Sequence, residues 1–329
     1  MFNFHRRRFT SWIACAALGS LALAAHAQPA DWPQKPISLV VGFAPGGSAD
    51  ILARDVAQKL SVSLGKQVVV ENKPGAGGTI AAATVAEAQP DGHTLLLATS
   101  GHAGSGALYS SLRYDPIKAF APIVTLAATP VVIVVPAQQP WKTLTELMDA
   151  ARKSPGKFNY AAGGGGATTT ALAAEFLKHD AGIDLVQIPY KGSGPALTAL
   201  LAGEVEAGFE IPSSALPYVN TGKLRALAVT TRERSAALPN VPTVIEQGIA
   251  NFEVTGWFGI MAPAATPKEV LARLNRELNT ILETKELRDR LSALGLEGVG
   301  GSSEDFQRLL ASDTQRYGEA IRRMGISPN

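Results

Sequence analysis

The sequence predicts an α/β protein of two lobes, each a mainly parallel sheet flanked by helices. Short apolar strands alternate with amphipathic helices along the chain. A glycine-rich loop stands between a strand and a helix twice, at residues 42–48 and 163–168. The 329 residues suffice for two ordinary domains, and 46% hydrophobic residues, 6% aromatics and 32 glycines are typical of α/β proteins with tight turns.

The first strand–loop–helix unit is the most informative stretch. Residues 37–41 read as a buried strand, residues 43–48 as a Pro/Gly loop, and Ser48 as the N-cap of an amphipathic helix. Gly46 and Gly47 allow a ligand to come close to the backbone. A helix N-terminus beside such a loop presents unpaired N–H groups and partial positive charge, which favour a carboxylate or phosphate. The alternative is a tight βα turn without a ligand.

The other elements continue this alternation. Further strands are expected at residues 67–71, 93–99, 130–136, 157–162, 185–190, 205–211, 224–230 and 252–262. Further helices are expected at residues 80–88, 196–203, 268–294 and 303–324, in a stretch capped by Thr143 and ending at residue 153, and after the second glycine loop. Residues 100–106 read as a loop, and the stretch around Tyr114 reads as irregular.

Two similar sets of strands and helices indicate two lobes. The C-terminal helices are expected to fold back on the first lobe, so that the second lobe is an insertion reached by two crossing strands. The predicted division is 28–128 with 250–329 for lobe 1 and 129–249 for lobe 2. Ligands of such sheets bind beyond the carboxyl ends of the strands, where two facing lobes close by a hinge.

Residues 1–27 are predicted to be a signal peptide. Arg6, Arg7 and Arg8 precede the apolar stretch 12–25, and Ala25-His26-Ala27 fits a cleavage site. Export by the Sec or the twin-arginine route remains open. The segment contains the one cysteine, and without it 27 Lys and Arg stand against 28 Asp and Glu. We therefore expect a periplasmic protein without disulfides and without a nucleic-acid partner.

The patterns of the common catalytic sites are missing. There is no G-x-x-x-x-G-K-[ST], no complete G-x-G-x-x-G and no G-x-S-x-G. After the predicted cleavage only His93, His102 and His179 remain, without the i+4 pairing of a metal site. His102 follows a strand and is a candidate for contact with an anion, although a packed histidine is the alternative. The sequence thus predicts a binding protein rather than an enzyme, without cofactor or metal.

Several motifs, in the same order, resemble the Bug family, the extracytoplasmic solute receptors of tripartite tricarboxylate transporters. They are GFAPGGSADILAR, VVVENKPGAGGTIAAATVAEAQPDGHTLLLATS, PYKGSGPALTALLAGEVEAGFE, GKLRALAVT, VPTVIEQG and GWFGIMAP. The resemblance implies a type II periplasmic binding protein fold, with a small carboxylate held in the cleft largely by backbone amides and bridging waters. It also implies membrane permease subunits as partners.

The resemblance also implies a set of ligand-binding residues. On lobe 1 they are Phe43, Ala44, Gly46, Gly47, Ser48, Ala49, Asp50, Thr99, Ser100 and His102; on lobe 2 they are Gly164, Gly165, Gly166, Ala167, Thr168 and Glu210. Ala171 stands where many relatives have histidine, and Glu210 replaces a common aspartate. Asp50 and Glu210 either complement local dipoles or receive an ammonium group, which would favour an amino acid.

We therefore expect a monomeric periplasmic solute-binding receptor. Its ligand is expected to be a di- or tricarboxylate, an aromatic carboxylate or an amino acid, passed unchanged to a permease. A secreted sensor or adaptor that docks on a signalling partner is the alternative. A secreted α/β enzyme is the least favoured interpretation, because the sequence shows no activated nucleophile.

Overall fold

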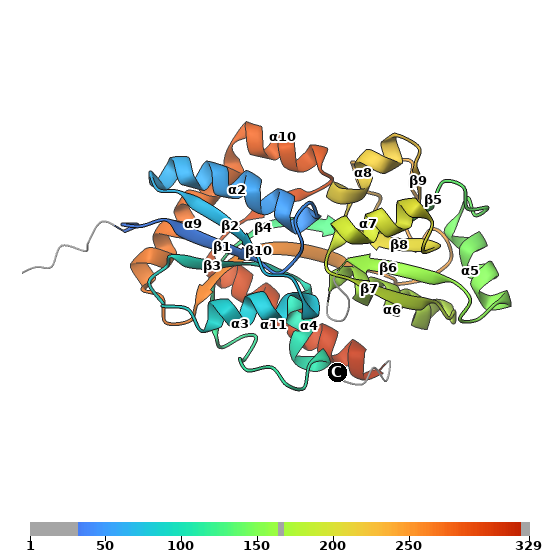
Figure 1. Cartoon of the computed structure of the whole chain (residues 1–329), viewed down its shortest axis with the longest axis horizontal. Coiled ribbons are helices and arrows are strands. Elements are labelled where there is room, and N and C mark those ends of the chain that lie inside the picture. Colours follow the sequence, from blue (N-terminus) through green and yellow to red (C-terminus); the bar gives the residue numbers. More distant parts are fainter. Residues whose placement is uncertain (1–31, 164–167, 324–329) are drawn as a thin grey trace, which may run out of the picture. The chain divides into compact units, whose positions relative to one another are not determined.

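The structure, a computed structural model, describes residues 32–163 and 168–323, so the predicted signal peptide lies outside it (Figure 1). All described helices and strands belong to the compact unit that begins at Lys35. They form two separate β-sheets, of six and five strands. Among the described residues no helix is long and apolar enough to cross a membrane, and no cluster of three or more His, Cys, Asp or Glu could hold a metal.

The first sheet has the strand order β11-β4-β10-β3-β1-β2. Its strands are β1 (Ile37–Val41), β2 (Val68–Asn72), β3 (Thr94–Thr99), β4 (Phe120–Pro130), β10 (Thr255–Pro263) and β11 (Glu297–Gly300). Its helices are α2 (Ser48–Leu64), α3 (Thr79–Ala86), α4 (Gly101–Leu108), α9 (Lys268–Glu283), α10 (Lys285–Ala293) and α11 (Ser303–Arg323), with the 3₁₀ turn η1 (Ala76–Gly78). Helices α2, α9 and α10 pack on one face, and α3, α4 and α11 on the other (Figure 1).

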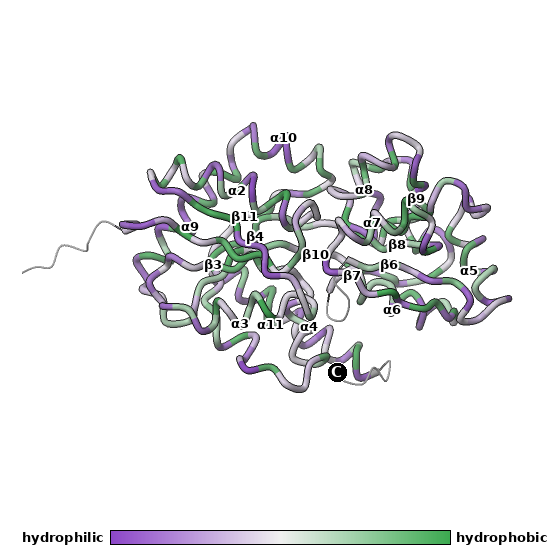
Figure 2. The backbone as a smooth tube through the Cα atoms, viewed as in Figure 1, coloured by the Kyte–Doolittle hydropathy of each residue, from purple (hydrophilic) through white to green (hydrophobic). Residues whose placement is uncertain are grey.

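The second sheet has the order β7-β6-β8-β5-β9. Its strands are β5 (Val132–Pro136), β6 (Asn159–Gly163), β7 (Val186–Tyr190), β8 (Ala207–Glu210) and β9 (Leu224–Val229). Its helices are α5 (Leu144–Lys153), α6 (Thr169–Ala181), α7 (Ser193–Ala202) and α8 (Pro212–Asn220). Every residue of β5 is buried, and the hydropathy colouring shows the apolar residues gathered along the strands (Figure 2).

Two chain segments cross between the sheets, as predicted. One runs from β4 to β5 through Val131, and the other from β9 to β10 through Thr230 and Val254. Thr230 joins both. Its N–H donates to the Val131 carbonyl (3.0 Å), and its Oγ1 accepts from the Val131 N–H (2.9 Å) and donates to the Val254 carbonyl (2.6 Å). One fully buried side chain therefore ties the two crossings together.

The two-lobed α/β fold is confirmed, but both sheets are mixed rather than mainly parallel. Among the named strands, parallel pairing is limited to β1 with its neighbours β2 and β3 and to β6 with its neighbours β7 and β8. The crossing strands β4, β5 and β10 pair antiparallel. The long strand β4 was not predicted, because its two prolines and small residues indicate irregular chain. Its buried place beside β10 overrides that local signal.

Two further local predictions are corrected. The loop predicted at residues 100–106 lies largely within α4, because the small residues let this helix pack closely on α11: a Cβ at Gly104 would lie 3.7 Å from the Cβ of Tyr317. The predicted helix 268–294 divides at Thr284, whose side chain caps α10 by accepting from the Leu287 N–H. The predicted cap of α5 is confirmed, since Thr143 accepts from the Glu146 N–H at 3.1 Å.

Candidate functional site

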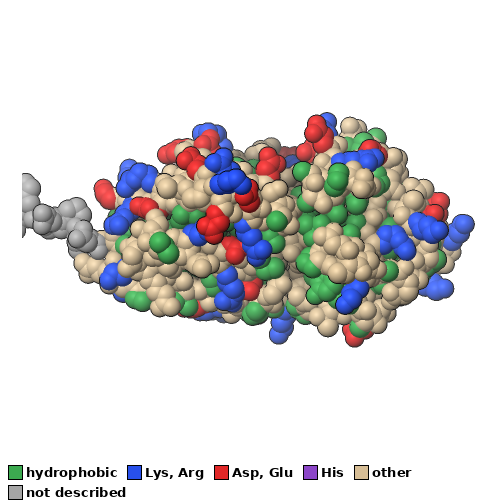
Figure 3. All heavy atoms as spheres, turned by 90° about the horizontal axis from the view of Figure 1, so that it is seen from above, with side chains coloured by type: hydrophobic (Ala, Val, Ile, Leu, Met, Phe, Trp, Pro, Cys, Tyr) green, Lys and Arg blue, Asp and Glu red, His purple; other side chains and the backbone are tan. Residues whose placement is uncertain are grey.

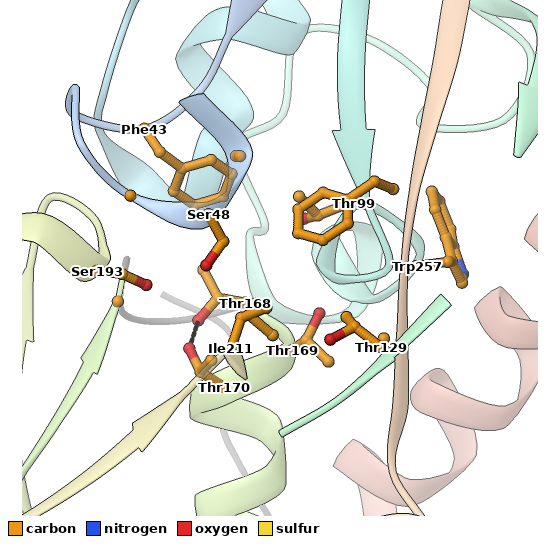
Figure 4. A pocket seen from close by; sticks show the side chains of 15 residues that line it. Phe43, Ser48, Thr99, Thr129, Thr168, Thr169, Thr170, Ser193, Ile211 and Trp257 are labelled. Atoms are coloured by element: carbon orange, nitrogen blue, oxygen red, sulfur yellow. Dashed lines mark hydrogen bonds between the residues drawn. The ribbon is translucent and has the colours of Figure 1, made fainter. Parts of the chain in front are cut away.

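A small cavity lies where the two sheets face each other (Figure 4). The centres of water-sized molecules can occupy about 40 Å³ of it. Residues of both lobes and of the crossing strands line it: Phe43, Gly47, Ser48, Ala49, Thr99, Thr129, Gly163, Thr168, Thr169, Thr170, Ser193, Ile211, Gly256, Trp257 and Phe258.

Four helices begin at this cavity. The first residues of α2, α6 and α7 line it, as does Ile211, the N-cap of α8. Helix α2 starts at Ser48, but the N-cap is Gly47 rather than the predicted Ser48, and no side chain caps the helix. Helix α7 likewise has no side-chain cap. Uncapped N–H groups and the positive ends of several helix dipoles thus converge on one space, which suits an anion.

The side chains around the cavity are neutral. Hydroxyl groups come from serines and threonines of both lobes, and the hydroxyls of Thr168 and Thr170 lie 3.2 Å apart (Figure 4). Aromatic walls come from Phe43, Trp257 and Phe258. No Asp, Glu, Lys, Arg or His is among the lining residues that the structure describes. On the face shown in Figure 3, acidic and basic side chains are instead interspersed over the outer surface.

Trp257 is held in place from behind. Its Nε1–H donates to Oδ2 of Asp313 in α11 at 2.8 Å, and Arg316 pairs with the other carboxylate oxygen at 3.0 Å. Phe306 packs edge-on against the indole, with ring centroids 5.1 Å apart. The aromatic wall is therefore rigid, and its polar N–H is already satisfied away from the cavity.

The two lobes touch around the cavity. The Ala44 N–H donates to the Lys191 carbonyl at 2.9 Å, and the Ser48 hydroxyl donates to the Ser214 hydroxyl at 3.1 Å. The hydroxyls of Ser100 and Thr169 also bond across the lobes. These contacts describe a closed arrangement of the two lobes.

The predicted ligand-binding residues divide into two groups. Those that line the cavity are Phe43, Gly47, Ser48, Ala49, Thr99 and Thr168; those placed elsewhere are Ala44, Gly46, Asp50, Ser100, His102 and Glu210. Gly164, Gly165, Gly166 and Ala167 lie outside the described residues. Ala44 contacts the other lobe, and Gly46 lies on the exposed part of its loop. Whether any of them binds a ligand remains a prediction.

Asp50 is turned away from the cavity. Its carboxylate accepts from the Gly46 N–H (3.0 Å) and the Asn72 amide (3.0 Å), and pairs with Arg54 at 2.9 Å. Burial alone would raise the pKa of Asp50, but the hydrogen bonds from Arg54, Gly46 and Asn72 hold it below its ordinary value. Asp50 therefore stays ionised and braces the glycine loop.

Ser100 and His102 are also engaged elsewhere. Ser100 is fully buried in contact with Thr169, and its N–H donates to the Trp257 carbonyl at 3.0 Å. His102 Nε2 lies 2.7 Å from the Pro116 carbonyl oxygen, and its ring stacks on Tyr114. Burial lowers the pKa of His102, so the imidazole is neutral. The histidine thus packs in lobe 1, the alternative that the sequence left open.

Glu210 ends β8 and is completely buried. Its Oε2 accepts from the Ser214 hydroxyl at 3.4 Å. Burial raises the pKa of Glu210 to about 8, despite the opposing effect of the nearby Ser193 and Ser214 hydroxyls. The carboxyl group is therefore mostly protonated at neutral pH and adds little negative charge behind the cavity.

Comparison with known proteins decides the family. The family model of the tripartite tricarboxylate transporter family receptor matches residues 52–326. The chain belongs to this family. A "UPF0065 protein in tcbD-tcbE intergenic region" of Pseudomonas sp. strain P51 is 38% identical to the receptor, over 99% of this chain and 97% of the relative. The predicted resemblance to the Bug family is thereby confirmed.

Solved structures agree with this. The periplasmic binding protein BugD superposes with a TM-score of 0.87 at 34% identity, covering 91% of the receptor and all of BugD. The structure of R. palustris Rpa4515 with adipate has a TM-score of 0.87 at 33% sequence identity, covering 91% of the receptor and all of Rpa4515. MatC of Rhodopseudomonas palustris with bound malate has a TM-score of 0.85 at 32% sequence identity, covering 88% of the receptor and all of MatC. The receptor is thus a solute-binding protein of the periplasmic type and not an enzyme.

Sequence reasoning left out much of the receptor's cavity. Its missed residues come from crossing strands and from helix starts: Thr129, Gly163, Thr169, Thr170, Ser193, Ile211, Gly256, Trp257 and Phe258. Thr169 and Thr170 directly follow Thr168, which was predicted, and Ser193 lies in the loop before the predicted helix 196–203. The starts of predicted helices could therefore have identified these three residues. For Gly256 and its neighbours no local signal exists, because the sheet alone brings β10 to the cavity.

Proposed function

We propose that the receptor captures a small organic carboxylate in the cavity between its lobes and releases it unchanged to a membrane permease. The convergence of four helix N-termini on a space lined only by neutral side chains, among the residues described, carries this proposal. Backbone N–H groups and hydroxyls supply the hydrogen bonds, and the helix dipoles supply the positive potential. Among the described residues that line the cavity, no ionisable side chain is present to act as a base or to activate a hydroxyl group.

Linear dicarboxylates are the first ligands to consider. Adipate is present with Rpa4515 and malate is bound to MatC, each about one third identical in sequence to this receptor. The aromatic walls of Phe43 and Trp257 also suit an apolar carbon chain or ring between the polar ends. Aromatic carboxylates therefore belong in the same screen, together with amino acids.

Residues 1–27 would direct export to the periplasm, and cleavage would follow Ala27. The lobes, 28–128 with 250–329 and 129–249, would then open and close about the crossings at Val131 and Thr230. The family to which the receptor belongs supports a tripartite tricarboxylate transporter permease as the acceptor. Recovery of permease subunits from membranes on immobilised, ligand-saturated receptor would test this.

A thermal-shift screen with adipate, malate, citrate, benzoate and glutamate tests the ligand class. A ligand present at 100 times its Kd should stabilise the folded receptor by about 2.7 kcal/mol, or roughly 4 °C in Tm for a chain of this size. Calorimetry should then show one site per chain, and chromatography should recover the acid unchanged. Chemical turnover of the acid, or no shift with any carboxylate, would refute the proposal.

A further inference from the structure

Glu210 sits in a closed polar network that the proposed function does not use. The side chain is 0% exposed, and Oε1 has no hydrogen-bond partner among the described residues. The Ser214 hydroxyl lies 3.4 Å from Oε2 and divides its one hydrogen between this oxygen and the Ile211 carbonyl at 2.9 Å. It accepts from the Ser48 hydroxyl of the other lobe at 3.1 Å. Ser48 and Ser193 both line the cavity. One hydroxyl group therefore separates the carboxyl from the contact that closes the lobes.

No charged group compensates this carboxyl from the elements packed around it. Strand β5, which places Val132 opposite Glu210, and helix α7 contain no ionisable side chain. Helix α8 contributes only Tyr218, and β6 only Tyr160, whose hydroxyl donates to Glu175. Helix α6 also packs on β8, and its ionisable side chains pair with one another: Lys178 with Glu175 and His179 with Asp180, each at 2.9 Å. On α2 the nearest acid in sequence to Ser48 is Asp50, which Arg54 neutralises.

A buried carboxylate without a cation or a full set of donors is costly, so the closed arrangement holds Glu210 in its protonated form. In this structure Ser48 and Gly47 of lobe 1 lie against Ser214 and Ser193. In an open arrangement they would no longer cover these serines, and water would reach this corner. Hydration favours the ionised carboxylate, as for an ordinary exposed glutamate. The protonation state of Glu210 is therefore linked to the position of the lobes.

We propose that closing the lobes on a carboxylate ligand takes up one proton from solvent at Glu210, so that the receptor binds the anion and a proton together. The neutral carboxyl adds no negative charge behind the helix N-termini that hold the anion. An ionised Glu210 would repel the ligand and resist burial, and thus favour the open lobes. The inference rests on the proposed function and deepens it, since it makes a proton the second solute of the same site.

The affinity should consequently depend on pH in a defined way. Burial raises the pKa of Glu210 to about 8 in the closed arrangement, whereas an exposed glutamate titrates near 4.5. At pH values between these two pKa values, one proton is taken up per ligand bound. The association constant of the ligand then falls by about tenfold for each unit by which pH rises. Above the higher pKa value Glu210 is ionised in both arrangements, so the uptake and the pH slope disappear.

Calorimetry with adipate and with malate measures this directly on the unmodified receptor. Above pH 6.5 both ligands are largely ionised, so they contribute few protons. Titration at pH 7 in buffers of different ionisation enthalpy should give close to one proton taken up per ligand, falling toward zero at pH 9.5. Binding with no proton uptake at pH 7 would overturn the inference and leave the proposed function intact. Failure of every carboxylate to bind would overturn both.

Two variants and one spectroscopic measurement identify the group. Glu210→Gln keeps the size of the side chain but is always neutral, so its affinity should lose the pH slope. Glu233→Gln, a matched change at an exposed glutamate of the same lobe, should retain the slope of the unmodified receptor. If Glu210→Gln fails to fold, the carboxyl ¹³C shift of Glu210 in the unmodified receptor decides: a higher titration midpoint with ligand than without supports the inference, and equal midpoints overturn it.

Discussion

Replacing Thr230 by valine should loosen the joint between the lobes without changing the shape of the side chain. Valine matches threonine in volume but cannot hydrogen-bond. The change removes the bonds from the Val131 N–H to Oγ1 (2.9 Å) and from Oγ1 to the Val254 carbonyl (2.6 Å). Both backbone groups lie beside a residue that is 0% exposed, so water cannot readily replace the hydroxyl.

The expected magnitude follows from these two bonds. Each lost hydrogen bond costs about 1 kcal/mol net, and a buried donor or acceptor left unpaired adds to this, against a small gain from the extra apolar group. We expect Thr230→Val to lower the free energy of unfolding by about 3 kcal/mol. At an unfolding entropy of about 2.1 cal/mol/K per residue, a chain of this size should lose roughly 5 °C of Tm.

Chemical and thermal unfolding of the receptor, with Thr230→Ser as the matched control, measures the effect. Serine keeps the hydroxyl and loses only a methyl group, so it should cost clearly less than valine. If Thr230→Val stays within about 1 kcal/mol of the unmodified receptor, or if both variants lose the same amount, the hydroxyl does not hold the two crossings together and the reasoning fails.

Three other changes test the site. Gly47→Val should abolish carboxylate binding in calorimetry with little change in Tm, because a Cβ there would already be in van der Waals contact with the Ser193 nitrogen across the lobes (3.4 Å), which leaves no room for the two γ-methyl groups when the lobes close; unchanged affinity would contradict this. Gly46→Ala should instead cost about 1 kcal/mol of stability through its φ of +82°, since a Cβ meets nothing within 4 Å. With saturating adipate, the stability of Glu210→Gln relative to the unmodified receptor should rise by up to about 1.4 kcal/mol per pH unit between pH 5 and 8. The reason is that Glu210 loses its proton at a lower pH in the unfolded chain than in the folded receptor, so the unmodified receptor loses stability as pH rises. Denaturant unfolding at several pH values measures this, and a difference that stays constant with pH would show that the group is not buried.

The start of the fold was predictable because its signals are local. The strand Ile37–Val41 lies where the sequence places it, and α2 begins at Ser48, one residue before the predicted start, since an apolar run, a glycine loop and an i+4 repeat are all read within a few residues. The same holds for the cap at Thr143. Strand β4 was missed, because its pairing with β10 joins segments more than 120 residues apart in the chain.

The candidate site was predictable in its chemistry but not in its members. Glycine loops at helix starts indicated an anion site, and three of the four helix N-termini at the cavity follow loops that the sequence shows. The direction of each side chain was not readable. Asp50 turns to Arg54 and Asn72, and His102 turns to Pro116, because each finds its hydrogen-bond partner there once the chain has folded.

The sequence by itself determined the class of fold and the family, and it predicted a small anion as the ligand, because these inferences depend on hydrophobic periodicity and on where glycines precede helices. Only the tertiary structure decided which residues meet at the cavity, that Thr230 joins both crossings, and that Glu210 is sealed away from water. Those properties arise from contacts between distant segments, and burial changes the chemistry of a carboxyl group in a way that its position in the sequence does not reveal.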